Sequence, residues 1–326
     1  MKKKLPIIYS DRYNITFLGL QKLHPFDSEK YGKVYNFLKQ TLGIKTYKPF
    51  YVKDEALTTV HPSNNLKSLK KSGNIAQIAE MGPLALIPNF ILQNKILAPM
   101  RYATGGTIKG SDLALKYGWS INLSGGYHHA KKDSGGGFCF FSDIAMAIRH
   151  LWEKDSDYKI LIVDLDAHQG NGFEEIFKHD KRVSILDIYN EANFPYDYNA
   201  RKYIDFDVPI KPYTETEKYL SVLNYNLPNA IDISEPDFVL YNAGTDIFKE
   251  DPLGHLAISE KGIIQRDEIV FKTVLQKKIP IEMVLSGGYT QKSGMIIGRS
   301  VENLLTKVIK SDNKRLSLTK HGISIQ

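Results

Sequence analysis

The stretch 158–168 reads YKILIVDLDAH, a short and nearly unbroken apolar run that ends in two aspartates and a histidine. Such a run is typical of a strand that is buried on both faces of a parallel sheet. Similar runs lie at 182–189, 237–244 and 279–288. Segments with apolar residues at helical spacing lie at 142–154, 214–231, 259–278 and 293–310. The alternation predicts an α/β fold, a doubly wound parallel sheet flanked by helices.

Other parts of the chain are less regular. We expect Ser142 and Ser259 to begin helices as N-caps. In the first 100 residues, HPSNN (61–65) and MGPLALIPNF (81–90) are predicted to be long loops. No internal repeat, Ser/Pro-rich linker or low-complexity tract divides the 326 residues. The sequence therefore predicts a single catalytic domain over 1–326.

The net charge of +7 lies at the two ends of the chain. Residues 2–4 are three lysines and 303–326 carry a net charge of +4, whereas 5–302 hold 35 basic and 35 acidic residues. We expect basic tails at 1–4 and 311–326, and no direct binding of nucleic acid, because a nucleic-acid-binding face is usually spread over the fold. No apolar run is long enough to span a membrane and no secretory signal is present, so a cytoplasmic protein is predicted.

Reactive residues follow several of the predicted strands, where ligands bind in doubly wound sheets. Asp166 and His168 are two positions apart after the first run, and we expect them on one face; Asp246 follows another strand. Three protein ligands with a position left for water form a catalytic metal site. Alternatively, Asp166 caps a helix and His168 packs in a loop, but the third residue on a separate strand end favours the metal. The single cysteine, Cys139, excludes a cysteine-rich zinc site and is predicted to be buried and inert.

His128 and His129 follow a glycine turn after the apolar run INLS (121–124). Adjacent side chains diverge, so the pair suits proton transfer more than joint metal ligation: one imidazole takes a proton from water and the other protonates the leaving group. A pair of exposed histidines without a role is the alternative, and the position after an apolar run disfavours it.

Three further side chains complete the predicted site. Asp164 and Asn171 are candidates to hold the far nitrogens of the catalytic histidines. Tyr289 follows two glycines, so its phenol can turn into a cleft and donate to a developing oxyanion. Tyr289 is one of 19 tyrosines, and packing alone is the alternative role.

Four segments resemble, in order, the active-site motifs of zinc-dependent histone deacetylases in the arginase/deacetylase superfamily: GGYHHAKKDSGGGFC (125–139), DLDAHQGNG (164–172), NAGTD (242–246) and SGGY (286–289). Several segments resemble the class IV subgroup specifically: SDRYNITFLGLQKLHPFD (10–27), LIPNF (86–90), TGGT (104–107), DLDAHQGNG (164–172) and NAGTDI (242–247). The resemblance covers residues 5–305.

The resemblance implies the arginase/deacetylase fold and a zinc amidohydrolase that cleaves N-ε-acyl-lysine in a protein or peptide. The zinc would be held by the three metal-site residues above, whose donors also suit Fe²⁺. Phe138 and Phe194 would flank the acyl-lysine channel, and Gly137 would offer its carbonyl to the substrate amide. A structural potassium ion is also implied, at a site matched by Asp164, Asp166, His168 and Asp187.

The chain departs from class I members in ways that alter the expectations. Asn171 replaces the carboxylate behind the second histidine, so we predict that His129 is mainly neutral and acts as the base. Glu80 is present, but no aspartate lies between 55 and 111 to grip the substrate backbone. The glycine run 135–137 is predicted to leave space at the channel, and class IV relatives favour long-chain acyl groups. We therefore expect fatty-acyl lysine to be preferred over acetyl lysine.

Other functions remain open on the sequence. An arginase needs a paired metal site with more carboxylates than this chain supplies. Hydrolysis of acetylpolyamines or other small acylamines stays an alternative, as does a catalytically silent protein that binds acyl-lysine.

Overall fold

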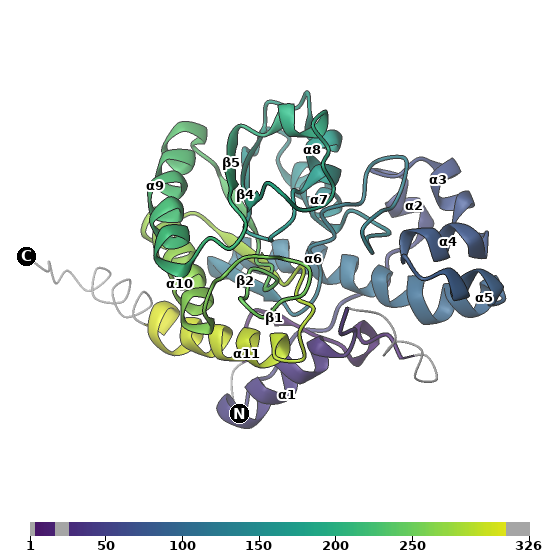
Figure 1. Ribbon diagram of the computed structural model, residues 1–326, viewed down its shortest axis with the longest axis horizontal. Coiled ribbons are helices and arrows are strands. Elements are labelled where there is room, and N and C mark those ends of the chain that lie inside the picture. Colours follow the sequence, from purple (N-terminus) through teal and green to yellow (C-terminus); the bar gives the residue numbers. More distant parts are fainter. Residues whose placement is uncertain (1–3, 17–25, 311–326) are drawn as a thin grey trace, which may run out of the picture.

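Seven parallel strands form one sheet in the computed structural model, which describes residues 4–16 and 26–310 (Figure 1). The arrangement confirms the predicted α/β fold with its doubly wound sheet. The strand order is β1-β2-β7-β6-β3-β4-β5. The strands are β1 (Ile7–Ile8), β2 (Trp119–Asn122), β3 (Ile160–Asp164), β4 (Val183–Asn190), β5 (Phe206–Ile210), β6 (Phe238–Asn242) and β7 (Ile281–Val284).

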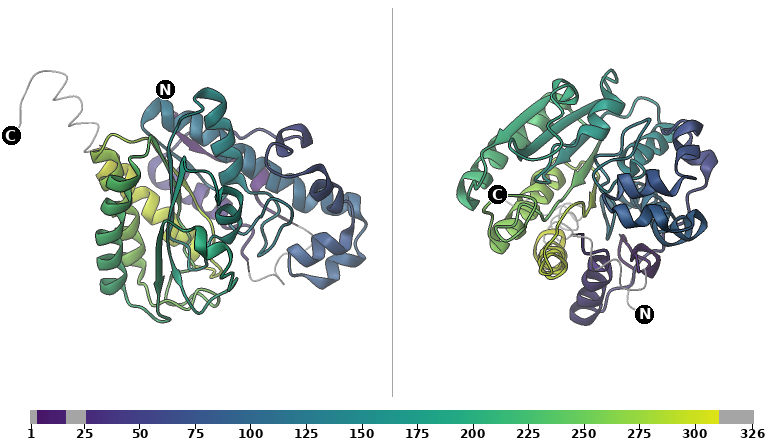
Figure 2. Two further views of the ribbon diagram at one scale, coloured as in Figure 1. Left: turned by 90° about the horizontal axis from the view of Figure 1, so that it is seen from above. Right: turned by 45° about the vertical axis from the view of Figure 1, so that its right-hand side comes forward.

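Helices cover both faces of the sheet. α9, α10 and α11 lie on one face, with α1 packed along α11, and α6 covers β2 and β7 on the other face with α7 beside it (Figure 2). The helices are α1 (Lys30–Leu42), α2 (Asp54–Leu57), α3 (Ser63–Ser68), α4 (Ser72–Ile78), α5 (Asn89–Leu92), α6 (Ala98–Tyr117), α7 (Asp143–Lys154), α8 (Asn171–Phe177), α9 (Thr216–Ser234), α10 (Glu260–Gln276) and α11 (Ser293–Asn303).

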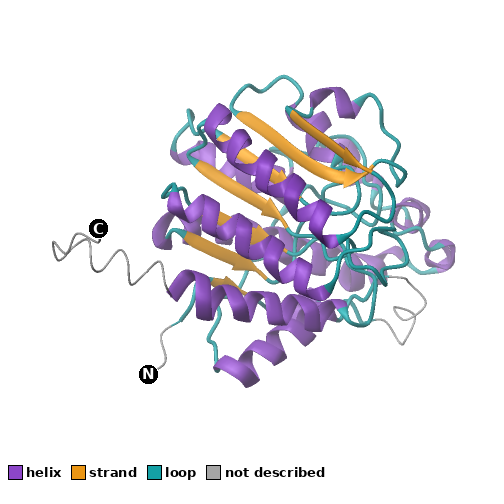
Figure 3. Ribbon diagram, turned by 60° about the vertical axis from the view of Figure 1, so that its left-hand side comes forward, coloured by secondary structure: helices purple, strands orange, loops and turns teal. Residues whose placement is uncertain are grey.

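The order of the strands reverses between β3 and β6. From β3 the sheet extends one way through β4 and β5, and the chain then returns to the other side of β3 with β6 and β7. Both central strands are buried along their whole length, and Asp164 pairs with Asn242 at their ends. The arrows point the same way in Figure 3, and loops gather at their heads. A doubly wound sheet opens its ligand crevice at such a reversal.

The predicted loops in the first 100 residues are wrong in part. α3 begins at Ser63 after Pro62 and is 6 residues long. Within 81–90, a 3₁₀ turn spans Gly82–Leu86, and α5, of 4 residues, begins after Pro88. Proline before or within the first turn suits a helix start, because its missing N–H would have no helical partner there. Elements this short show too little periodicity to be detected.

One of the two predicted caps is confirmed. The Ser259 side chain accepts a hydrogen bond from the Gly262 N–H at 3.1 Å, at the start of α10. Ser142 precedes α7, but its side chain makes no capping bond. Its backbone N–H instead donates to Nε2 of buried His61 at 3.0 Å.

Parts of three predicted segments lie outside the described residues. These parts are 1–3 and 311–326 of the basic tails, and 17–25 of the class IV stretch 10–27. Within the residues that are described, the structure holds no helix that is both long enough and apolar enough to cross a membrane.

Candidate active site

Asp166, His168 and Asp246 converge beyond the ends of β3 and β6. Nδ1 of His168 lies 3.1 Å from Oδ1 of Asp166 and 3.0 Å from Oδ2 of Asp246. All three side chains are buried, and their candidate ligand atoms lie within 4.8 Å of one another. β3 ends at Asp164, so a bend after the strand, and not strand alternation as predicted, brings Asp166 and His168 together.

In each carboxylate of this group, one oxygen accepts hydrogen bonds from neighbouring segments and the other oxygen faces His168. Oδ2 of Asp166 accepts from the Gly287 N–H at 2.9 Å and from Ser286 Oγ at 2.8 Å. Oδ1 of Asp246 accepts from the Ala167 N–H at 2.9 Å. These bonds fix both carboxylates and leave two oxygens and one imidazole nitrogen aimed at a common point.

Glycines keep the surroundings of the carboxylates clear. A Cβ atom at Gly287 would lie 2.3 Å from Oδ2 of Asp246, and one at Gly244 would lie 2.2 Å from Oδ2 of Asp166. A side chain at either position would therefore collide with the site. Two carboxylates and an imidazole, with no side chain at these two positions to crowd them, fit a divalent transition metal.

The group attracts positive charge strongly. Burial lowers the pKa of His168, but its hydrogen bonds with Asp166 and Asp246 outweigh burial and raise the pKa to about 10. Burial raises the pKa of Asp246 to about 7, and repulsion by Asp166 adds to this effect. A metal cation at Nδ1 of His168 would take the place of the proton that these carboxylates favour.

The adjacent histidines have different partners. Nδ1 of His128 lies 2.8 Å from Oδ2 of Asp164, whereas Nδ1 of His129 lies 2.9 Å from Oδ1 of Asn171. The Asn171 amide also donates through Nδ2 to Asp197 at 3.2 Å, so its oxygen must face the histidine. Nδ1 of His129 is therefore the N–H donor, and its Nε2 carries a lone pair.

The two rings also differ in charge. Burial lowers the pKa of His128, but the charges of Asp164 and Asp166 outweigh it and raise the pKa to about 9. Burial lowers the pKa of His129 well below its usual value, and the positive charges of His128 and His168 add to this effect. Near pH 7 the pair thus holds one charged and one neutral imidazole.

A buried aspartate that sequence reasoning missed holds the glycine turn before the histidines. The Asp143 carboxylate accepts from the Gly126 N–H at 2.9 Å and the Tyr127 N–H at 2.8 Å, and from Thr107 Oγ1 at 2.6 Å. Gly126 has a φ of +87°, which disfavours any side chain there. Asp143 looks like an ordinary acidic residue in the first turn of a helix, so the sequence carries no signal for this role.

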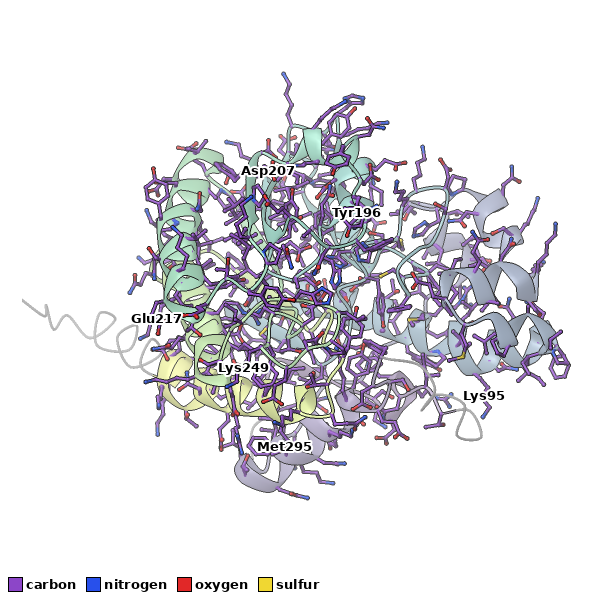
Figure 4. All side chains as sticks on the ribbon, viewed as in Figure 1. Lys95, Tyr196, Asp207, Glu217, Lys249 and Met295 are labelled. Carbon is purple, nitrogen blue, oxygen red and sulfur yellow. The ribbon has the colours of Figure 1, made fainter. Side chains whose placement is uncertain are left out.

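A cavity of about 270 Å³ reaches the candidate metal group at His168, and all three predicted channel residues line it: Gly137, Phe138 and Phe194. The Phe194 ring lies 5.0 Å from the His129 ring, and the Tyr289 ring lies 6.1 Å from the Phe138 ring. Exposed Tyr196, labelled in Figure 4, is also on the wall. The complete lining is Glu80, His129, Gly137, Phe138, His168, Ala192, Asn193, Phe194, Tyr196, Leu253, His255 and Tyr289.

The glycine run does not leave the space that we predict from it. A Cβ atom at Gly137 would lie 2.4 Å from Cδ2 of His129, and one at Gly135 would lie 2.6 Å from the Cys139 carbonyl oxygen. Only Gly136 faces open space. These glycines allow the backbone to approach its neighbours closely. Cys139 is buried, as predicted, and burial raises the pKa of its thiol.

Two other residues that the sequence did not reveal hold the segment that carries Tyr289. The Asp251 carboxylate accepts from the Tyr289 N–H at 2.7 Å. Lys30, fully buried in α1, donates through Nζ to the carbonyls of Ser286 at 2.6 Å and Gly287 at 2.9 Å. Both contacts join segments far apart in the chain, so no local motif announces them.

Comparison with known proteins decides the family. The family model described as histone deacetylase domain matches residues 24–307. The chain belongs to the histone deacetylase family. As a member of that family, it is a hydrolase that acts on amide bonds. The arginase/deacetylase superfamily inferred from the motifs is therefore confirmed.

Individual relatives agree with this assignment. "Histone deacetylase 2" of Arabidopsis thaliana is 45% identical over 304 residues, covering 92% of this chain and 79% of the relative. "Acetoin utilization protein AcuC" of Bacillus subtilis is 27% identical over 269 residues, covering 77% of this chain and 68% of the relative. The crystal structure of the HDA15 HD domain matches with a TM-score of 0.75 at 18% identity, covering 93% of this chain and 90% of that one, which supports the fold.

The pairing of His129 with an amide makes a testable prediction. In the double variant Asn171→Asp/Asp197→Asn, the amide and the carboxylate exchange places and the number of charges is kept. A carboxylate at 171 should raise the pKa of His129 by about one to three pH units. If neutral His129 is the base, the acid limb of kcat against pH moves to higher pH, and the basic limb stays in place.

The single variant Asp197→Asn is the matched control, because it keeps the amide at 171. An acid limb that does not move in the double variant would contradict the assigned role of His129.

Proposed function

We propose that this protein removes acyl groups from N-ε-acyl-lysine, with one zinc ion held by Asp166, His168 and Asp246. The convergence of these three side chains below a cavity lined by His129 and Tyr289 carries the proposal. Within residues 4–16 and 26–310, no other set of three or more His, Cys, Asp or Glu side chains brings its ligand atoms close enough together to hold a transition metal. A single such group favours deacylation over the paired-metal chemistry of an arginase.

The metal, when bound, would polarise the acyl carbonyl and make the attacking water more acidic. Two carboxylates and one imidazole suit zinc, and they would accept Fe²⁺ as well, so availability decides between the two. The rest of the chemistry falls to the protein's own side chains.

The two histidines divide the proton transfers. Neutral His129, with its lone pair on Nε2, takes the proton from the attacking water. Nε2 of charged His128 lies 3.7 Å from Oδ1 of Asp166, and it can give a proton to the leaving lysine amine. Asp164 orients the charged ring of His128, and Asn171 keeps neutral His129 in the tautomer with its proton on Nδ1.

Tyr289 supports the oxyanion of the transition state. Burial raises the pKa of its phenol well above the usual value, and the nearby carboxylates of Asp246 and Asp166 add to this effect. The phenol therefore stays protonated and can donate a hydrogen bond to the developing negative charge.

The lysine side chain would pass between Phe138 and Phe194, whose rings line the cavity. The Gly137 carbonyl contacts the Cys139 thiol at 3.2 Å, and its second lone pair can accept from the substrate amide N–H.

Removal of the Tyr289 hydroxyl tests the mechanism. Tyr289→Phe should lower kcat by about 10²–10³, the usual cost of one oxyanion donor. The melting temperature and metal content should match those of wild type. Tyr225→Phe, which removes an exposed hydroxyl on α9, is the control and should keep full activity. Wild-type kcat in Tyr289→Phe would defeat the mechanism.

We propose further that the protein is of class IV and prefers long-chain fatty acyl groups to acetyl. The support is the resemblance of the class IV segments, together with a second cavity beside Tyr289 whose walls include Phe26, Tyr31 and Met100. This cavity has a volume of about 40 Å³. That volume admits roughly three water-sized groups, so a fatty chain requires the walls to move.

The length preference is tested on one peptide that carries either an acetyl or a myristoyl group on the same lysine. We expect kcat/KM for the myristoyl peptide to be at least roughly tenfold higher, about 1.4 kcal/mol in the transition state. Met100→Ala, which enlarges the second cavity, should raise turnover of the myristoyl peptide alone. Comparable kcat/KM values would overturn the preference, and faster turnover of an acetylpolyamine would identify a small-amine hydrolase.

Several finer features stay part of this proposal. A structural potassium ion would use Asp164, Asp166, His168 and Asp187. The support for this ion is the resemblance alone, since burial and the neighbouring carboxylates of Asp164 and Glu174 raise the pKa of Asp187 well above its usual value. We propose one catalytic domain over 1–326 with basic tails at 1–4 and 311–326, and a cytoplasmic location.

A further inference from the structure

Arg266 is a fully buried arginine of α10 that has no part in the proposed chemistry. Its guanidinium donates to three backbone carbonyls. Nη1 donates to Leu165 at 3.2 Å and also to Gly244, and Nη2 donates to Ala243 at 3.4 Å. All three carbonyls lie just beyond the last residues of β3 and β6.

These carbonyls belong to the two segments that carry the candidate metal ligands. Leu165 precedes Asp166 directly, and Gly244 lies two residues before Asp246. One planar group therefore joins the segment after β3 to the segment after β6. The contacts are made to backbone carbonyls, so they fix the backbone positions from which the ligand side chains project.

The orientation of the guanidinium is fixed by a buried ion pair. Oδ1 of Asp267 lies 2.9 Å from Nε and 2.8 Å from Nη2 of Arg266. Asp267 accepts in turn from the Tyr241 hydroxyl and from the Ser300 hydroxyl of α11. A buried charge is tolerated only when it is paired and hydrogen-bonded, and here both charges are.

We propose that Arg266 is a positioning residue that holds the two ligand-bearing segments at the separation that the metal requires. The role depends on the planar fork of the guanidinium, which can reach several carbonyls in fixed directions at once. A lysine keeps the charge but concentrates it at one point, so it cannot join both segments in the same way. This inference rests on the proposed metal site.

The test measures metal binding, independently of turnover. Wild type and Arg266→Lys are freed of metal and titrated with Co²⁺ alone, against a competing chelator. The Co²⁺ visible absorption spectrum reports the geometry of the ligands. We expect Arg266→Lys to bind Co²⁺ about 10–100-fold more weakly, the usual effect of losing a partner that orients a ligand. Its absorption band should also shift.

Ser300→Ala is the matched control, because it weakens the same buried network without touching the three carbonyls. It should lower the melting temperature and leave the Co²⁺ affinity and spectrum unchanged. If Arg266→Lys does not fold, Asp267→Asn replaces it. The asparagine keeps an acceptor oxygen for the guanidinium but removes the negative charge that orients it. The Co²⁺ affinity of this variant should fall severalfold.

The possible outcomes separate the two proposals. One outcome is that wild type binds one equivalent of Co²⁺ and that Arg266→Lys shows the same affinity and spectrum. This result, or the same result in Asp267→Asn if that variant is needed, would overturn the positioning role and leave the metal site standing. A wild-type protein that binds no Co²⁺ would overturn both.

Discussion

Two buried carboxylates face one imidazole where the strand order reverses, and the surrounding structure compensates their charge. Breaking a buried pair by removing one partner typically costs about 3–5 kcal/mol, because a charge is left without compensation. Asp166 and Asp246 are therefore each held by backbone or hydroxyl donors from neighbouring segments. The excess negative charge of the group is what a divalent cation satisfies, so the same constraint shapes both the fold at this point and the proposed chemistry.

The same constraint explains the difference between the two neighbouring histidines. His128 is paired with Asp164 and lies near a candidate metal ligand, so it is held in the charged form. His129 is paired with an amide and lies beside that charge, so it is held neutral. The proposed acid and the proposed base are thus distinguished by their partners, within two consecutive residues of one turn.

The sequence predicted the parts of the site that are local. Apolar runs that end in reactive residues marked the carboxyl ends of β2, β3, β6 and β7, and those strands prove to be contiguous in the sheet. It did not reveal Lys30 or Arg266, because their contacts join segments far apart in the chain, 101 residues apart between Leu165 and Arg266. It did not reveal Asp143 either, because this residue looks like an ordinary acidic residue in the first turn of a helix. The glycine run misled for a similar reason: the atoms that crowd Gly137 belong to His129, and spacing along the chain does not show that approach.

The proposed chemistry requires one metal ion at this group of three side chains. The most direct measurement removes metal with a chelator and follows hydrolysis of an acyl-lysine peptide while Zn²⁺ is returned in known amounts. We expect negligible hydrolysis without metal and a linear recovery that reaches its plateau at one equivalent of Zn²⁺ per chain. Full activity in the metal-free protein, or a plateau only at two equivalents, would contradict it.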